Sequence, residues 1–499
     1  MLDKRSEFEL KLLVPADFQV PPLDDGSAGV ATVSEQEPQQ LSAVYFDTPD
    51  LLLMRRGITL RHRVGDDEGP MWTLKLPTNG DKALRSEVEY AGNGQEPPAE
   101  ARAILFGVLN GSALGPVAEI KTRRRRWNLA NAEGVDLAQL VDDRVSILDG
   151  NEIRDSFREI EIEAHDIGRK GLKQIADVIR DAGASPEQRS KASRALEVLR
   201  GAMPTTAVDE QIDPGDPAGK AVGPALARAL DRLLAFDPYA RLGEVEGVHQ
   251  LRVAGRRLRS VLRTFALLLD EQKMTEAHEG LRWLGQVLGD VRDLDVLTES
   301  LHAHAGDSEQ ALAPVSQALA ERRLATKQVL AEALSSEKYG ALIHLLSALT
   351  ADPALVTSPG GPIEDELPAL ARRMWRKLHK VADVLAPDSS EADFHRARIL
   401  AKRSRYAAET VSEFLPSKLS KRLRPFAEDA ESLQNVLGEH QDATYARATL
   451  QEFAPQHQAD GALSFQLGRT VERYDQIARQ KRREFFKLWR KLGRSRIRE

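Results

Sequence analysis

The chain of 499 residues contains no cysteine. This absence excludes disulfide bonds, zinc sites with thiolate ligands and catalytic cysteine nucleophiles. The sequence also lacks an apolar run of the ~20 residues that a membrane-spanning helix requires. Its first residues, Met1-Leu2-Asp3-Lys4-Arg5, are charged and do not begin an apolar signal segment. We therefore expect a cytoplasmic protein with no membrane partner.

Aromatic residues are scarce, at 5% of the chain, and 70 Lys and Arg nearly balance 76 Asp and Glu. Proteins that bind nucleic acid usually carry a basic excess, and those that bind single strands interleave aromatic with basic residues. This sequence does neither, so nucleic acid is not an expected partner. A chain of this length exceeds a single hydrophobic core, which predicts more than one domain.

The first two hundred residues read mostly as strands separated by turn-rich segments. Eight antiparallel strands would suit a barrel closed on itself, which leaves no exposed edge. Short helices are expected at 98–109 and a helical pair at about 168–201. The expected strands are 6–14, 40–47, 57–63, 70–77, 84–90, 117–127, 134–143 and 156–164.

Charged residues occupy every second position of several of these strands. In Glu7-Phe8-Glu9-Leu10-Lys11 the two carboxylates and the ammonium share one face, and the two apolar side chains share the other. The same alternation occurs at 59–63, 85–89 and 157–163, and the run 121–127 has arginines in both phases. A single such strand is typical of a solvated surface. Several together, each with an apolar opposite face, indicate a barrel with a charged interior.

A charged interior must be compensated by a metal, by a ligand or by its own opposite charges. Carboxylates are suited to Mg²⁺ or Mn²⁺, and Lys and Arg are suited to phosphate oxygens. The combination favours metal-dependent phosphoryl transfer, which needs metal bridging, cationic neutralisation and a positioned water rather than a covalent nucleophile.

Glu7-x-Glu9-x-Lys11 resembles the ExExK signature of the CYTH family, the triphosphate tunnel metalloenzymes. The resemblance covers residues 1–203 and implies an eight-stranded antiparallel β tunnel in which water attacks a triphosphate with the help of a metal. Its further motifs follow in order: Tyr45-Phe46-Asp47-Thr48, Leu60-Arg61-His62-Arg63, Leu74-Lys75, Arg85-x-Glu87-x-Glu89, Phe157-x-Glu159-x-Glu161 and Ser190-Lys191.

The resemblance implies roles for residues of the expected tunnel. It implies that Glu7, Glu9 and Lys11 act in catalysis. We expect His62 to face outward, and Glu163 continues the carboxylate face toward the tunnel rim. The implied ligands of Mg²⁺ or Mn²⁺ are Glu7, Glu9, Asp143, Glu159 and Glu161. The implied triphosphate-binding residues are Lys11, Arg61, Arg63, Lys75, Arg85, Arg124, Arg126 and Lys191.

Three choices stay open at this point. Asp142 is adjacent to Asp143, and either could be the inward-facing aspartate. The run 123–126 has arginine in both phases, and we favour Arg124 and Arg126, which share one face. The sequence does not choose between Mg²⁺ and Mn²⁺.

The rest of the chain is helical almost throughout and contains an internal repeat. Residues 204–220, rich in Pro and Gly, read as a linker to this region. The helical domain then spans 221–499, and its halves are about 221–351 and 364–499. A second repeated segment, called here the second echo, occurs once in each half. It pairs Leu288-Gly289-Asp290-Val291-Arg292-Asp293 with Leu437-Gly438-Glu439-His440-Gln441-Asp442.

His249 and His395 begin the two copies, and basic residues follow each at matched intervals that fall on one stripe of a helix. No acidic residue occurs between Gly247 and Leu269 or between Phe394 and Ala408. Like charges at these spacings repel, and the first stripe spans roughly 20 Å of helix, so it suits an extended polyanion. The basic residues are Arg252, Arg256, Arg257, Arg259 and Arg263 in the first copy and Arg398, Lys402, Arg403 and Arg405 in the second.

These two helices resemble those of the CHAD family, the conserved histidine α-helical domain, over about 221–499. The resemblance implies two pseudo-symmetric helical bundles and binding of inorganic polyphosphate, with His249 and His395 beside the basic residues. Zinc ligation by the histidines is the alternative, but no third ligand accompanies either of them at ligand spacing.

Together these patterns predict a multidomain α+β protein: an N-terminal eight-stranded antiparallel β tunnel with flanking helices, then a C-terminal all-α pair of pseudo-symmetric bundles. The expected function is metal-dependent hydrolysis of inorganic triphosphate, or of another short triphosphate, with polyphosphate bound by the helical domain. The alternative is a non-catalytic polyphosphate-binding protein associated with polyphosphate granules. A third reading is cyclisation of a nucleotide, since related tunnels make cyclic AMP.

Overall fold

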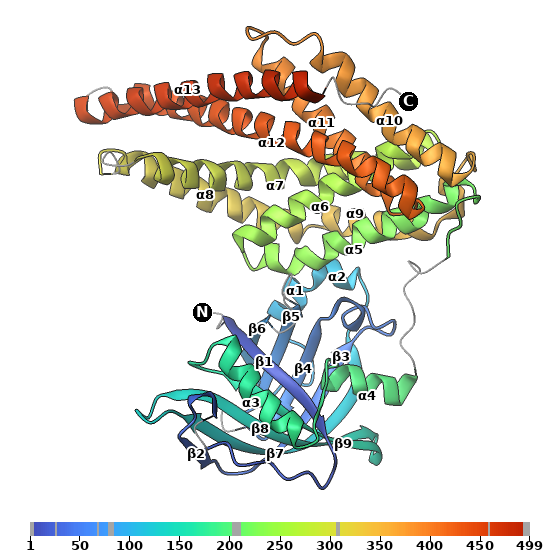
Figure 1. Ribbon diagram of the computed structural model, residues 1–499, viewed down its shortest axis with the longest axis vertical. Coiled ribbons are helices and arrows are strands. Elements are labelled where there is room, and N and C mark those ends of the chain that lie inside the picture. Colours follow the sequence, from blue (N-terminus) through green and yellow to red (C-terminus); the bar gives the residue numbers. More distant parts are fainter. Residues whose placement is uncertain are drawn as a thin grey trace. The chain divides into compact units, whose positions relative to one another are not determined.

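The computed structural model describes residues 4–24, 27–66, 69–77, 84–201, 211–305, 310–457 and 460–492, and at 4–8, 27, 84–86, 304–305, 353 and 456–457 it describes the backbone alone. The chain divides into two compact units, Met1–Thr206 and Ala207–Glu499. The first is built on a β-sheet and the second is made of helices (Figure 1), which confirms the predicted α+β class. Within the described ranges, every helix is too short or too polar to cross a membrane.

Ten antiparallel strands form the sheet, two more than predicted. Eight of them follow the order β1-β6-β5-β4-β3-β7-β8-β9, and the short strands β2 and β10 pair with β7 and β1. These two escape prediction because neither has an alternating apolar pattern. The bounds are β1 Lys4–Val14, β2 Thr32–Glu35, β3 Gln39–Asp47, β4 Thr59–Val64, β5 Met71–Pro77, β6 Leu84–Ala91, β7 Gly115–Ala130, β8 Asp136–Asp149, β9 Glu152–Ala164 and β10 Ser185–Pro186.

Strand β1 joins the two ends of the sheet. Its residues 4–8 pair with β6, and its residues 9–14 pair with β9. The pairings therefore return to their starting strand, as a tunnel requires. In the described registers no residue of β1 pairs with both β6 and β9, so the sheet is joined by successive halves of one strand and is not a completely closed barrel.

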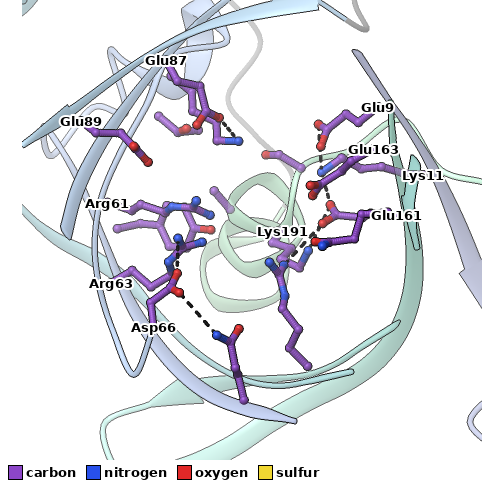
Figure 2. Close-up of a pocket in the computed structure, with 18 of the residues that line it drawn as sticks. Glu9, Lys11, Arg61, Arg63, Asp66, Glu87, Glu89, Glu161, Glu163 and Lys191 are labelled. Carbon is purple, nitrogen blue, oxygen red and sulfur yellow. Dashed lines mark hydrogen bonds and ion pairs between the residues drawn. The ribbon is translucent and has the colours of Figure 1, made fainter. Parts of the chain in front are cut away.

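Helix α4 (Lys191–Arg200) fills one end of the space inside the sheet (Figure 2). Alternate residues of a strand share a face, so Phe157, Glu159 and Glu161 of β9 all point inward. The inward face of β9 is therefore apolar at Phe157 and charged at Glu159 and Glu161. The apolar end packs on α4, and the charged end encloses a cavity. The apolar contacts join Ala192, Ala195 and Leu196 to Tyr45, Ile120, Val145, Ile147 and Phe157.

The outer face of the sheet packs on α3 (Arg169–Asp181). Burying a Leu or Ile side chain contributes about 1.5–3 kcal/mol, so this outer layer supplies stability that a charged interior does not. Two short helices, α1 (Ala99–Ile104) and α2 (Phe106–Leu109), occur where helices were expected. The outer contacts join Leu172, Ile175 and Ile179 to Leu12, Leu140, Ile160 and Ile162.

Arg158 on β9 and Asp142 on β8 form a buried ion pair on the outer face. The Nε and Nη2 atoms of Arg158 each donate to a carboxylate oxygen of Asp142 at 2.8 Å. Its Nη1 donates to the backbone carbonyls of Ala16 at 3.1 Å and Phe18 at 2.6 Å. The pair therefore ties the β8–β9 hairpin to the segment that follows β1, and Asp142 faces away from the tunnel.

Nine long helices form the described part of the second unit. They are α5 Val222–Arg241, α6 Val245–Thr264, α7 Glu271–Ala305, α8 Ala313–Leu334, α9 Glu337–Ala351, α10 Ile363–Ala382, α11 Glu391–Ser412, α12 Ser417–Phe453 and α13 Gly461–Leu492. Short 3₁₀ helices lie at Ser27–Gly29, Met54–Arg56, Ala218–Ala221, Pro353–Leu355 and Ala454–His457.

Two of the apolar clusters among the described residues join six of these helices. One joins α7 and α8 of the first repeat half to α12 and α13 of the second, through residues that include Leu297, Leu319, Leu450 and Tyr474. The other lies among α10 to α13, through residues that include Leu378, Phe394, Leu433 and Phe485. The two basic helices of the repeat, α6 and α11, contact each other, so their stripes meet.

Removal of the Asp142 carboxylate should destabilise the first unit strongly. The variant Asp142→Ala leaves the guanidinium of Arg158 buried without its partner, which costs about 3–5 kcal/mol. The matched control is Asp149→Ala on the same strand, because its ion pair with Arg154 is exposed and such pairs contribute about 0–1 kcal/mol. Chemical denaturation measures both, and equal losses of unfolding free energy would contradict the structural role of the buried pair.

Candidate functional site

The charged end of the tunnel encloses a cavity whose walls come from eight strands and from the start of α4 (Figure 2). Nine of the expected site residues line it: Glu9, Lys11, Arg61, Arg63, Lys75, Arg124, Arg126, Glu161 and Lys191. Four carboxylates outside the expected ligand set also line it: Asp66, Glu87, Glu89 and Glu163. The structure thus brings together residues that the sequence separates by up to 182 positions.

One wall of the cavity holds two ammonium groups among carboxylates. Lys191 Nζ lies 2.5 Å from Glu159, 2.9 Å from Asp143 and 3.1 Å from Glu161. Lys11 Nζ lies 2.5 Å from Glu161 and 3.4 Å from Glu9. Ser190 caps α4 by accepting a hydrogen bond from the backbone of Ser193 at 3.1 Å, which fixes the helix start that carries Lys191.

These contacts decide the protonation of the wall. Burial lowers the pKa of Lys191, but the carboxylates of Asp143, Glu161 and Glu159 outweigh burial and hold that pKa well above its ordinary value. Burial alone would raise the pKa of Glu161, whereas Lys11, Lys191 and Arg124 bring it well below its ordinary value. Glu159 differs, because burial is the larger effect and raises its pKa. The ion pair between Lys191 and Glu161 is therefore charged on both sides.

Geometry decides two of the three choices that the sequence left open, namely which aspartate and which arginines face inward. Asp143 faces inward and accepts hydrogen bonds from Arg124 Nε at 2.8 Å and Nη2 at 2.6 Å, while Asp142 pairs with Arg158 outside. Arg124 and Arg126 line the cavity, as favoured. Arg123 and Arg125 are exposed on the other face.

The opposite wall carries Arg61 and Arg63 on β4 and Lys75 on β5. Arg63 Nη2 lies 2.5 Å from Asp66, and Lys75 pairs with Glu87. Among the described residues, the buried Nε atoms of Arg61 and Arg63 have no hydrogen-bond partner. Burial lowers the pKa of Arg63 to about 10, and the charge of Arg61 contributes. An anion with several oxygens would satisfy these donors.

Two carboxylate triads could hold a divalent cation. The oxygens of Glu9, Glu161 and Glu163 lie within 4.8 Å of one another, and so do those of Asp143, Glu159 and Glu161. Oxygen ligands of this kind fit Mg²⁺ or Mn²⁺. In the second triad, Lys191 Nζ contacts all three carboxylates. In the first triad, Lys11 Nζ contacts Glu9 and Glu161, and we favour this triad for a metal. Its Glu163 was outside the expected ligand set, although the alternation along β9 continues to it.

Three expected residues fall outside this arrangement. The side chains of Glu7 and Arg85 lie outside the described residues, and only their backbone pairing across β1 and β6 is given. His62 faces outward as expected, with its ring centre 4.8 Å from that of Trp72 and a ring nitrogen 3.0 Å from the carbonyl oxygen of Gly92.

In the helical unit, the stripes of α6 and α11 bring four basic residues together: Arg252, Arg256, Arg398 and Lys402, called here the central cluster. Burial lowers the pKa of Lys402 to about 6, and the charges of Arg398 and Arg256 add to this effect. Burial likewise lowers the pKa of Arg256. The cluster therefore holds more positive charge than its surroundings compensate.

The second echo of the repeat supplies the carboxylates of this cluster. Arg252 lies 3.3 Å from Asp293, and Arg398 lies 3.8 Å from Asp442. The guanidinium groups of these two arginines pack over Gly289 and Gly438, four residues before each aspartate. The echo, which the sequence left without a role, therefore positions one arginine in each half.

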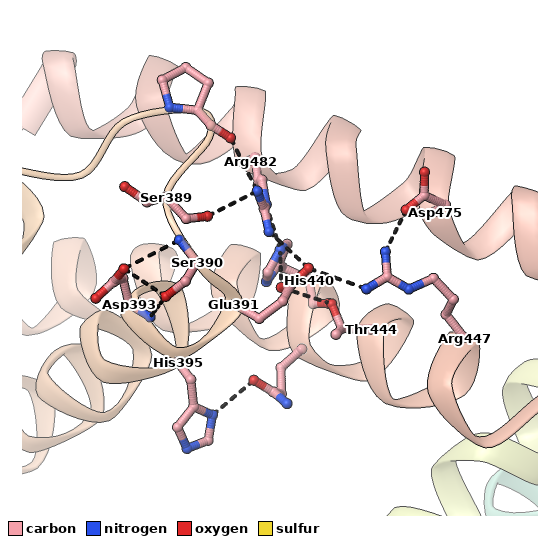
Figure 3. A network of polar contacts seen from close by, with 12 residues as sticks. Ser389, Ser390, Glu391, Asp393, His395, His440, Thr444, Arg447, Asp475 and Arg482 are labelled. Atoms are coloured by element: carbon pink, nitrogen blue, oxygen red, sulfur yellow. Dashed lines mark hydrogen bonds and ion pairs between the residues drawn. The ribbon is translucent and has the colours of Figure 1, made fainter. Parts of the chain in front are cut away.

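The two histidines are residues of α6 and α11, and neither belongs to a metal-ligand set in the described residues. His395 is exposed, and its Nδ1 lies 2.8 Å from Gln441 Oε1 (Figure 3). Burial lowers the pKa of His249, and the charge of Arg292, the counterpart of Gln441 in the echo, adds to this.

Two other expected residues already have a carboxylate partner. Arg257 and Arg405 both pair with Glu409, Arg405 at 2.7 Å, so one carboxylate bridges α6 and α11. Near the C-terminus, Arg482 of α13 bonds to His440 Nε2 at 3.0 Å and to the carbonyl of Ser389 at 3.2 Å (Figure 3). Arg482 thus fastens α13 to its neighbours and is not free for an anion.

Comparisons with known proteins agree with this division of the chain. The model of the CYTH domain matches residues 5–194, and the model of the CHAD domain matches residues 224–451. Proteins of Mycobacterium tuberculosis strains H37Rv and CDC 1551, both described as uncharacterized, are 30% identical to this chain over 510 residues, which is 95% of this chain and 94% of theirs.

Solved structures are similar to one part of the chain or the other. The CHAD domain from the plant Ricinus communis is 25% identical, with a TM-score of 0.42, over 56% of this chain and 97% of that one. A putative adenylyl cyclase from Hippeastrum, described as having a dominant triphosphatase activity, is 18% identical, with a TM-score of 0.23, over 37% of this chain and 93% of that one. The matches to both domain models and to relatives aligned along nearly their whole length show that the chain belongs to the family of proteins in which a CYTH domain is followed by a CHAD domain.

Proposed function

We propose that the tunnel hydrolyses inorganic triphosphate, or another short triphosphate, with Mg²⁺ or Mn²⁺, and that the helical domain binds inorganic polyphosphate. The observation that carries the first half is the lining of the cavity. It combines carboxylates with at least seven Lys and Arg side chains, and its described residues offer one aromatic ring, that of Tyr45. A nucleobase would need an apolar or stacking surface, so the lining favours a chain of phosphates.

The proposed roles follow from the two walls. Mg²⁺ or Mn²⁺ held by Glu9, Glu161 and Glu163 would neutralise phosphoryl charge and activate a water. Arg61 and Arg63 on the opposite wall would bind phosphate oxygens through donors that lack a partner in the described residues. The remaining cations would stabilise the charge that develops on the transferred phosphoryl group. These are Lys11, Lys75, Arg124, Arg126 and Lys191.

Asp143 and Glu159 are proposed to position two cations rather than to bind the metal. Both carboxylates contact Lys191 Nζ, and Asp143 also accepts two hydrogen bonds from Arg124. They would hold these two cations toward the phosphates, as positioning residues. Glu7 and Arg85 keep their expected roles as a metal ligand and a phosphate-binding residue.

Polyphosphate binding is proposed for the helical domain because the central cluster places like charges close together. Lys402 and Arg256 stand without a carboxylate partner among the described residues, and the buried Nε atoms of Arg256 and Arg398 have no hydrogen-bond partner there. Phosphate oxygens would relieve both deficits. The non-catalytic alternative keeps this half of the proposal and gives the tunnel the role of a receptor.

Metal-dependent release of phosphate from tripolyphosphate tests the enzyme. We expect release by the wild type with Mg²⁺ or Mn²⁺ and at least about a hundredfold loss in Glu9→Gln/Glu161→Gln, because the variant removes two carboxylates of the first triad and one of the second. The control is Glu152→Gln, an exposed carboxylate at the start of β9. No release from the wild type, with polyphosphate bound, would favour the receptor. Pyrophosphate made from ATP would favour cyclisation.

Metal dependence distinguishes the two triads. The variant Glu163→Gln should raise the Mg²⁺ or Mn²⁺ concentration needed for half-maximal hydrolysis about tenfold or more, because it removes one oxygen ligand of the first triad. Glu89→Gln is the matched control, because Glu89 lines the same cavity outside both triads. Equal metal requirements in the two variants would reject Glu163 as a ligand.

Polyphosphate affinity should fall as pH rises from about 6 to 8. Free Lys402 loses its proton above pH 6, while bound phosphate favours the charged form, so binding takes up a proton in this range. One linked proton changes affinity by at most about tenfold per pH unit. Lys402→Arg stays charged and should show a flatter pH profile. His249 and the ligand titrate in both proteins, so a difference between the two pH profiles comes from residue 402. Identical slopes of the logarithm of affinity against pH would therefore show that Lys402 takes up no proton.

A further inference from the structure

Four helices, α6, α7, α10 and α11, bring a second group of cations to one side of the central cluster. Arg259 and Arg263 extend the stripe of α6, and Arg403 stands next to Lys402 on α11. Burial lowers the pKa of Arg263 to about 10, and the nearby charges of Arg403, Arg259 and Arg282 add to this. Burial also lowers the pKa of Lys377, with Arg373 and Arg403 contributing. The group, called here the Arg403 cluster, comprises Arg259, Arg263, Arg282, Arg373, Lys377 and Arg403.

No carboxylate compensates this cluster within the described ranges. None of its six members forms an ion pair with a described residue, and the buried Nε atoms of Arg259 and Arg403 lack a hydrogen-bond partner there. The neighbouring His278 is similar, because its Nδ1 bonds to the carbonyl of Met274 and its buried Nε2 has no partner. Partly buried like charges without a partner cost free energy, which a polyanion would offset.

The repeat places a different arrangement on the opposite side. Arg257 and Arg403 occupy the same position in the two copies, eight residues after the histidine, and Arg405 and Arg259 share the position ten residues after it. Arg257 and Arg405 both pair with Glu409, and Arg405 also lies 2.9 Å from Glu431. Equivalent arginines are therefore neutralised on one side and left without a partner on the other.

The difference has its origin in one repeat position. Fourteen residues after the histidine, the first copy has Arg263 and the second has Glu409. Glu409 neutralises its side, whereas Arg263 adds a further charge to the Arg403 cluster. The helices that flank the two sides differ as well. On α5, Arg228 lies 3.3 Å from Glu413, while Arg373 and Lys377 of α10 have no carboxylate partner among the described residues.

We propose that a polyphosphate chain bound at the central cluster leaves it on one side only, through the Arg403 cluster, which forms a second phosphate subsite. The proposal rests on the proposed polyphosphate binding of the helical domain and adds a direction to it. From Arg256 to Arg263 the helix rises roughly 10 Å, so one long chain can occupy both clusters. Occupying two linked subsites raises the affinity for long chains over that of either subsite alone.

A pair of matched double variants tests the direction. Arg373→Gln/Lys377→Gln removes two charges from α10, on the side of the Arg403 cluster. Arg228→Gln/Arg232→Gln removes two charges, also four residues apart, from α5 on the side of Glu409. Binding of long-chain polyphosphate is measured for the full chain at fixed salt, after thermal unfolding shows that both variants fold. We expect about tenfold weaker binding in the α10 variant and less than about twofold change in the α5 variant.

A third variant tests the opposite side. Glu409→Gln removes the carboxylate that neutralises Arg257 and Arg405, and we expect it to strengthen long-chain binding severalfold. When it is combined with the α5 double variant, we expect the loss of the α5 charges to weaken long-chain binding. Equal losses from the α5 and α10 variants would overturn the one-sided path and leave diffuse attraction to a basic domain. No loss from either would remove the second subsite. Failure of the wild type to bind polyphosphate would instead reject the proposed function of the domain.

Discussion

A buried charge needs a partner of opposite sign within a few ångströms, because the protein interior screens it poorly and water cannot reach it. This constraint governs the tunnel. Alternation along β8 and β9 places Asp143, Glu159 and Glu161 on one inner wall, where they could not all stay ionised alone. Lys191 Nζ lies within 3.1 Å of all three carboxylates, and Arg124 donates two hydrogen bonds to Asp143. The wall is stable as a network, and Glu161 is the carboxylate of the three that lines the cavity.

Helix α4 links this electrostatic requirement to the core of the first unit. Its apolar face packs against inward-facing residues such as Val145 and Phe157, and so it occupies the end of the tunnel that carries no charge. The same packing holds the helix start in the middle of the charged end, where Lys191 meets its three carboxylates. Stability and site geometry therefore depend on one helix, and its position explains why the interior divides into an apolar and a polar end.

The helical unit meets the same constraint incompletely. Its central cluster has two aspartates from the second echo, Asp293 and Asp442, for four cations. On one side of the cluster Glu409 neutralises Arg257 and Arg405. On the other side no described carboxylate neutralises the Arg403 cluster. A charge deficit of this kind is a reason to expect an anionic partner, whereas the balanced network of the tunnel wall needs a metal and a substrate only for its chemistry. The two units thus would handle phosphate by different means.

Much of the fold and of the site could be predicted from the sequence, because strand alternation and helix periodicity are local. The Glu9, Glu161 and Arg61 faces, the two basic helices and the strand positions all follow from such periods. Local patterns could not place Lys191 among three carboxylates, decide between Asp142 and Asp143, or add Glu163 to the first carboxylate triad, because these depend on which strands and helices meet. The same holds for the two sides of the helical unit: the sequence by itself determined a doubled basic stripe, and only the packing of α6 against α11 decided that Glu409 neutralises Arg257 as well as Arg405.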